Sequence, residues 1–66
     1  MPNAGLPRSW TVRPIRALRK GLRLTNEQFA TKVGVSVRTV IRWQTGEERP
    51  SPLAREKLDT IAREVT

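Results

Sequence analysis

The strongest constraint on the fold lies in residues 25–46, TNEQFATKVGVSVRTVIRWQTG, where two glycines mark the ends of two short helical windows. Thr25 is followed three positions later by Gln28, the capping-box pattern in which each side chain satisfies a backbone N–H of the first helical turn. Gly34 follows an apolar group, at the position where a left-handed residue ends a helix at the lowest cost. The pattern predicts a helix over about residues 26–33.

A second helix is predicted directly after this one. Ser36 can cap its start and Gly46 can end it, so it covers residues 37–45. Two helices joined by a turn of about three or four residues that contains glycine form a helix-turn-helix unit. A unit of this kind docks in DNA, with its second helix in the major groove.

Periodicity alone leaves two choices for the buried face of the 37–45 helix. One stripe holds Val37, Val40, Ile41 and Gln44. The other holds Val40 and Trp43, and we expect it to be buried because tryptophan brings the larger apolar surface. At 100° per residue, the opposite side, with Val37 at its margin, then presents Arg38, Ile41, Arg42 and Thr45.

A further helix is expected before this unit. Thr11 can cap it, Pro14 is tolerated in its first turn, and Gly21 is expected to end it. Its core face holds Ile15, Leu18 and Leu22. An adjacent basic stripe either follows a phosphate backbone or is only the solvated face of the helix, and it comprises Arg16, Arg19, Lys20 and Arg23.

A last helix is expected after the unit, capped by Ser51 with Pro52 in the first position that proline prefers. Its apolar face closes the bundle and comprises Ala54, Leu58, Ile61, Ala62 and Val65. Alternatively, the apolar end near Val65 meets a partner chain. The fold class is therefore all-α, a compact bundle of four or five short helices. Residues 1–10, rich in turn formers, are expected to form a flexible N-terminal arm, and residues 11–66 the domain.

The charge is uneven along the chain. Lys and Arg number 13 against 6 Asp and Glu, a net charge of +7. Residues 1–46 carry nine basic side chains and one acidic one, and residues 47–66 carry four basic and five acidic ones. The basic field belongs to the part that contains the two-helix unit, as expected of a surface that faces a polyanion.

Composition also excludes several classes of protein. The chain has no cysteine, histidine or tyrosine and its acids are scattered, so we expect no disulfide, no metal, no cofactor, no catalytic residues and no enzyme. No run of about 18 apolar residues occurs, and no signal peptide is evident. We expect a soluble, cytoplasmic protein.

Five segments carry a resemblance: Phe29-Ala30, Gly34-Val35-Ser36, Val40, Trp43-Gln44-Thr45-Gly46 and Arg49-Pro50-Ser51. Over about residues 12–64 the chain resembles the phage-repressor and Cro-like (XRE) helix-turn-helix family. The resemblance implies a lambda-repressor-like bundle whose third helix enters the major groove. It places the base-reading positions at Val37, Arg38 and Arg42, beside Ser36 and Thr39.

The resemblance also implies contacts with the DNA backbone. A phosphate contact falls on Asn26, where the family commonly has glutamine, and Thr45 and Arg49 are the contacts expected near the loop after the third helix. Arg16, from the basic stripe of the first helix and not from the resemblance, is a further expected phosphate contact. Family members often pair an arginine of the first helix with a glutamate of the third. Here those places hold Arg19 and Gln44, so Arg19 either bonds to a neutral acceptor or turns toward DNA.

These observations predict sequence-specific binding of double-stranded DNA by a transcriptional regulator. A homodimer would place its two recognition helices about 34 Å apart on a palindromic site. The alternative is an antitoxin-like protein-interaction module of a toxin–antitoxin pair, which in this family often uses the same fold and has a protein partner.

Overall fold

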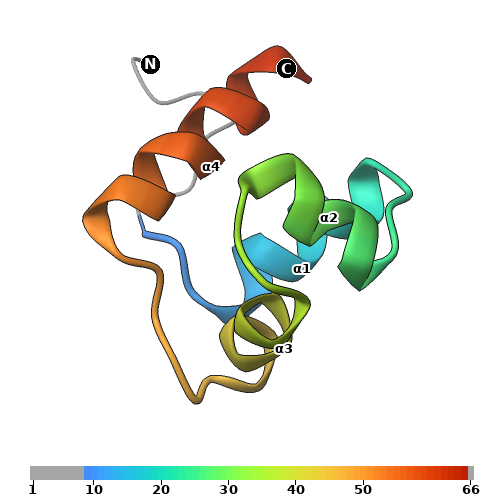
Figure 1. Cartoon of the computed structure of the whole chain (residues 1–66). Helices are drawn as coiled ribbons and strands as arrows, with labels where there is room; N and C mark the ends of the chain where they lie inside the picture. Colours follow the sequence, from blue (N-terminus) through green and yellow to red (C-terminus); the bar gives the residue numbers. More distant parts are fainter. Residues whose placement is uncertain (1–8, 66) are drawn as a thin grey trace.

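The computed structural model describes residues 9–65, and within them the chain forms four helices and no strand. They are α1 (Val12–Gly21), α2 (Asn26–Val33), α3 (Val37–Thr45) and α4 (Pro52–Glu64) (Figure 1). The all-α prediction is confirmed, and the bounds predicted for the two central helices are those of α2 and α3. Most of the predicted arm, residues 1–8, lies outside the described residues, so the arm and the domain boundary stay predictions.

Side-chain caps start three of the four helices. Thr25 accepts from the backbone N–H of Gln28 at 3.1 Å, and the Thr25 N–H donates to the Gln28 side chain at 2.9 Å, which completes the predicted capping box. Ser36 and Ser51 accept the backbone N–H three residues on. Thr11 also stands at an N-cap, but its side chain makes no capping hydrogen bond. The expectation that Thr11 caps α1 is therefore confirmed for the position and wrong for the bond.

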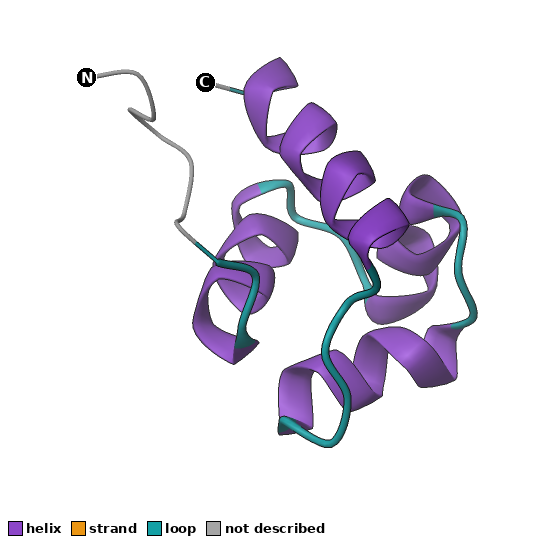
Figure 2. Ribbon diagram, turned by 90° about the vertical axis from the view of Figure 1, so that its left-hand side faces the viewer, coloured by secondary structure: helices purple, strands orange, loops and turns teal. Residues whose placement is uncertain are grey.

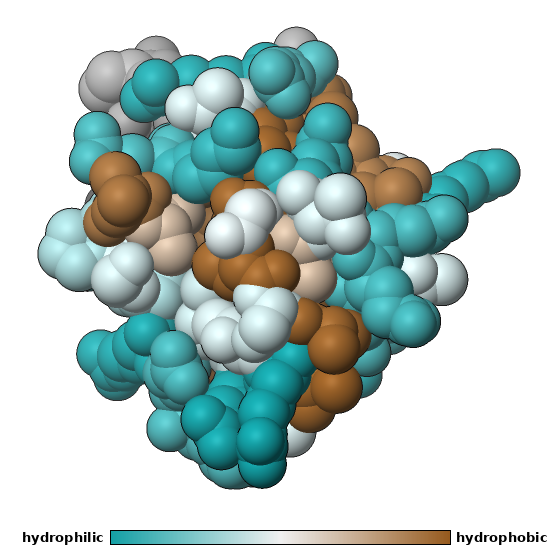
Figure 3. All heavy atoms as spheres, viewed as in Figure 1, coloured by the Kyte–Doolittle hydropathy of each residue, from teal (hydrophilic) through white to brown (hydrophobic). Residues whose placement is uncertain are grey.

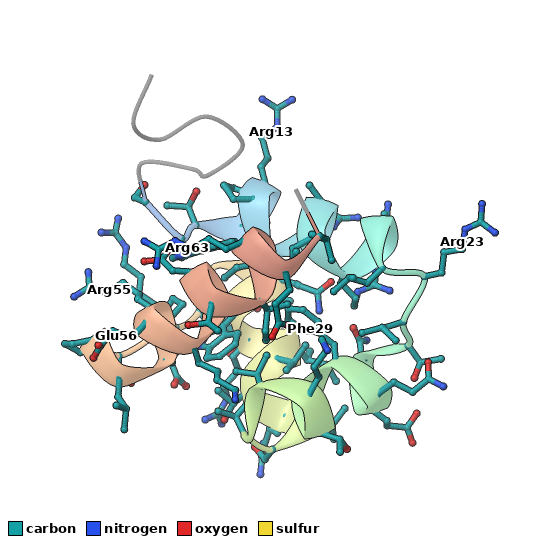
Figure 4. All side chains as sticks on the ribbon, turned by 90° about the horizontal axis from the view of Figure 1, so that it is seen from above. Arg13, Arg23, Phe29, Arg55, Glu56 and Arg63 are labelled. Carbon is teal, nitrogen blue, oxygen red and sulfur yellow. The ribbon has the colours of Figure 1, made fainter. Side chains whose placement is uncertain are left out.

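The helices of the central unit end as predicted, on left-handed glycines at Gly34 (φ 91°) and Gly46 (φ 85°). The end of α1 is different. Gly21 is its last residue, but the left-handed residue of the following turn is Arg23, with φ 58°. This backbone region is unfavourable for a residue with a Cβ atom, so the α1–α2 turn carries conformational strain. Figure 4 shows the Arg23 side chain pointing away from the molecule.

The core lies where the four helices meet. Val40 and Trp43 are 0% and 2% exposed, which confirms the choice of the tryptophan stripe as the buried face of α3. In the view of Figure 4, Phe29 points from α2 into the interior. The other buried apolar residues are Trp10, Ile15, Ala30, Val33, Leu58, Ile61 and Ala62. Since α3 contacts both α1 and α2, its orientation is fixed from two sides.

Trp10 belongs to this core, with 5% of its surface exposed. Its indole Nε1 donates to Oδ1 of Asp59 in α4 at 2.7 Å. The bond ties the segment before α1 to the last helix.

The arrangement leaves α3 at one side of the molecule. In Figures 1 and 2, α3 lies at the bottom and α4 at the top. The helix α2 contacts both of them. Hydrophilic side chains gather at the bottom of the molecule, over α3 and the loop that follows it (Figure 3).

Candidate nucleic-acid interface

The outward side of α3 presents the side chains that the sequence placed there. Arg38 is exposed, Ile41 is 43% exposed, and Val37 at the margin is 37% exposed. Val40 and Trp43 anchor the opposite side of the helix in the core. A short helix with one buried stripe thus offers a convex, partly basic surface to a partner.

Arg42 lies on the same outward side and is half-exposed. Its Nη1 atom is 3.9 Å from Oε1 of Glu48, in the loop after α3. An exposed ion pair at this distance contributes about 0–1 kcal/mol, so a stronger anionic partner can replace Glu48.

Thr45 ends α3 with its hydroxyl already engaged. Its Oγ1 donates to the carbonyl oxygen of Arg42 at 3.2 Å and to Oε1 of Glu47 at 3.1 Å. The single hydroxyl proton is shared between these two acceptors. A phosphate at Thr45 would have to compete with Glu47 for it.

Two hydroxyls meet at the start of α3. Ser36 Oγ accepts from the backbone N–H of Thr39 at 3.1 Å, and the two side-chain oxygens lie 2.9 Å apart. Both residues therefore stabilise the first turn of α3. Ser36 is exposed and Thr39 is half-buried, so the pair lies at the edge of the outward side.

Three side chains from three helices form a hydrogen-bonded network beside α3. Arg19 of α1 donates from Nε to Oε1 of Gln44 at 3.1 Å and from Nη1 to the Leu24 carbonyl at 2.9 Å. Gln44 of α3 donates from Nε2 to Oδ1 of Asn26 at 2.8 Å and to the Val40 carbonyl at 3.2 Å. The network joins α1, α2 and α3 at the N-terminus of α2.

This network decides between the two alternatives for Arg19. The arginine bonds to the neutral oxygen of Gln44, and its side chain is held against the protein instead of turning outward. The physical reason is that Arg19 has two oxygen acceptors within the protein, one from Gln44 and one from Leu24. The contact between Gln44 and Asn26 was not predicted, because a separation of 18 residues gives no sequence signal for it.

Arg16 and Arg49 lie apart from the network. Both are exposed, and within residues 9–65 neither makes a side-chain hydrogen bond or ion pair with the residues of α3. Arg49 lines a small pocket of about 140 Å³ together with Trp10, Val12 and Trp43. The structure therefore leaves both guanidinium groups available to an external anion.

The described part of the chain holds no group of three or more acidic, histidine or cysteine side chains that could bind a metal ion. None of its helices combines the length and the apolar character needed to cross a membrane.

Comparison with known protein families gives the following result. A family model described as helix-turn-helix matches residues 15–60, which include α2, α3 and the turn between them. No curated protein and no solved structure matches the chain.

Proposed function

The chain belongs to the helix-turn-helix family, and we propose that it binds double-stranded DNA in a sequence-specific manner as a transcriptional regulator. The observation that carries this proposal is the orientation of α3. Val40 and Trp43 hold one side of the helix in the core, and the other side presents Arg38, with the half-exposed Arg42 beside it. The width of the major groove admits a helix in this orientation.

The base-reading roles follow from the chemistry of the outward side. Arg38 and Arg42 have the forked donors that suit the O6 and N7 acceptors of guanine. Val37 can contact the methyl group of thymine. Ser36 and Thr39 flank this set at the start of α3.

The remaining proposed contacts fix the register of the protein on the duplex. The side chains assigned to phosphates are Asn26 at the start of α2, Arg16 on α1, and Thr45 and Arg49 after the reading positions. Such contacts raise affinity for every sequence alike and make binding sensitive to salt. The excess of basic side chains over residues 1–46 supports this assignment.

Selection of bound sequences from a random duplex pool tests the proposal. We expect a short enriched motif, and a palindrome with half-sites about one helical turn apart if the protein binds as a homodimer. Affinity for the enriched duplex should exceed that for a shuffled duplex by at least about a thousandfold at physiological salt. Equal retention of both duplexes would contradict sequence-specific binding.

The second candidate is an antitoxin-like module that binds a protein partner. A groove of about 500 Å³ between α4 and the turn after α2 supports it, since Leu53 at its edge is 77% exposed. Figure 3 shows hydrophobic side chains reaching the surface between α2 and α4. Leu53→Asp separates the two candidates: it should leave DNA binding unchanged and abolish binding of a partner that uses this groove.

A further inference from the structure

The orientation of each amide in the network at α2 is fixed by its neighbours. A guanidinium group has only donors, so the atom of Gln44 that faces Arg19 must be the oxygen. The other end of Gln44 is then the NH₂ group, which also faces the Val40 carbonyl, an acceptor. The NH₂ group lies 2.8 Å from Asn26, so the atom of Asn26 that receives it must be Oδ1.

The orientation of Gln44 thus sets that of Asn26. Because Oδ1 of Asn26 points to Gln44, the Nδ2 group occupies the other branch of the planar carboxamide. Within residues 9–65 this NH₂ group has no hydrogen-bond partner in the protein, and Asn26 is only half-buried. The group that Asn26 offers to an external ligand is therefore a donor of two hydrogen bonds.

We propose that Gln44 is a positioning residue for DNA binding, which turns the Asn26 carboxamide so that Nδ2 donates to a phosphate oxygen. This inference rests on the proposed function, which places a phosphate at Asn26. A phosphate oxygen only accepts hydrogen bonds, so the reverse orientation would set Oδ1 against it and repel it. Gln44 does not touch DNA in this assignment and acts through Asn26.

Glutamate at position 44 would reverse the arrangement. A carboxylate has only acceptors, so it would still bond to Arg19 but would draw the Nδ2 group of Asn26 toward itself. Oδ1 of Asn26 would then face the phosphate. The carboxylate introduced by Gln44→Glu also pairs with the positive charge of Arg19. The variant should therefore stay folded, with a melting temperature equal to or higher than that of the original protein.

A double-mutant cycle with Asn26→Ala and Gln44→Glu tests the proposal on the selected duplex. We expect Gln44→Glu to lower affinity by about fivefold beyond its charge effect, which is the loss expected for one amide–phosphate hydrogen bond. In the Asn26→Ala background the additional loss should vanish. If Gln44→Glu lowers affinity equally with and without Asn26→Ala, the loss comes from the added negative charge alone, and the proposal is overturned.

Gln28→Glu is the matched control. It adds the same negative charge as Gln44→Glu, in the first turn of α2, but keeps the capping box and does not bond to Asn26.

A second measurement uses the free protein and does not depend on the proposed function. In NMR exchange experiments the Nε2 protons of Gln44 should exchange slowly with water and the Nδ2 protons of Asn26 rapidly. The reverse order would overturn the orientation even if the protein binds no DNA.

Discussion

Arg19 of α1 and Gln44 of α3 form a hydrogen bond between Nε and Oε1 at 3.1 Å, although 25 residues separate them. The bond replaces the arginine–glutamate ion pair that the family resemblance implies at these places. The second bond of Arg19 goes to the Leu24 carbonyl. One arginine therefore joins α1, the α1–α2 turn and α3.

Removal of Arg19 should destabilise the fold. Arg19→Ala leaves the Gln44 oxygen and the Leu24 carbonyl without this donor, and hydrogen bonds to charged groups contribute about 1.5–3 kcal/mol. We expect a loss of about 2–3 kcal/mol in the free energy of unfolding, measured by urea titration. Arg16→Ala on the same helix is the control and should change stability by less than about 0.5 kcal/mol, because Arg16 is exposed. Equal effects of the two substitutions would contradict the structural role of Arg19.

Two arginines should affect DNA binding differently. Arg38→Ala removes a proposed base contact, so it should cost about 1–3 kcal/mol on the selected duplex and relax preference at one base pair. Arg16→Ala removes a proposed phosphate contact, so it should weaken binding to all sequences alike and lower the salt slope by about 1. Fluorescence anisotropy over a salt series measures both. If both variants lose affinity equally on selected and shuffled duplexes, Arg38 does not read a base.

Substitution of Glu48 should strengthen DNA binding. Its carboxylate lies 3.9 Å from the Arg42 guanidinium and adds negative charge beside the outward side of α3. Glu48→Gln frees Arg42 and removes repulsion from phosphates, which should raise affinity by about 0.5–1 kcal/mol, and less at high salt. Glu56→Gln on α4 is the control with the same change in net charge. A gain no larger than that of the control would show that Glu48 does not compete for Arg42.

The left-handed backbone at Arg23 predicts a stabilising substitution. Arg23→Gly relieves the steric cost of φ 58°, and the gain should be about 0.5–1 kcal/mol after the larger backbone entropy of glycine is subtracted. Gly34→Ala is the opposite test. An added Cβ at Gly34 meets no atom within 4 Å, so its expected loss of about 1 kcal/mol comes from the backbone alone. Thermal unfolding measures both effects. A lower melting temperature for Arg23→Gly would contradict the claim that the backbone at Arg23 is strained.

Trp10 should contribute more to stability than its place before α1 suggests. Trp10→Ala should cost about 3–5 kcal/mol, since the side chain is buried in the core. Trp10→Phe keeps most of the apolar surface but loses the bond to Asp59, so it should lower the free energy of unfolding by about 1–2 kcal/mol. In a cycle with Asp59→Ala the two losses should be non-additive. Additive losses would mean that the 2.7 Å contact does not contribute to stability.

Most of the local structure was predictable from the sequence. The bounds of α2 and α3 follow from Thr25, Ser36, Gly34 and Gly46, because caps and left-handed glycines act within one helical turn. The buried face of α3 follows from the size of Trp43. Once that face is chosen, the helical repeat alone puts Arg38 on the opposite side, so the outward orientation of the proposed reading positions was also predictable.

The contacts between helices were not predictable in the same way. Asn26 and Gln44 were separate departures from the family pattern, and only the fold brings their amides to 2.8 Å. Trp10 and Asp59 are 49 residues apart, and nothing in their spacing pairs them. The sequence by itself determined the bounds of α2 and α3 and the face that each buries, because those preferences depend on neighbours within about four residues. The tertiary structure decided which polar groups meet across the bundle, because that depends on how the helices pack against one another.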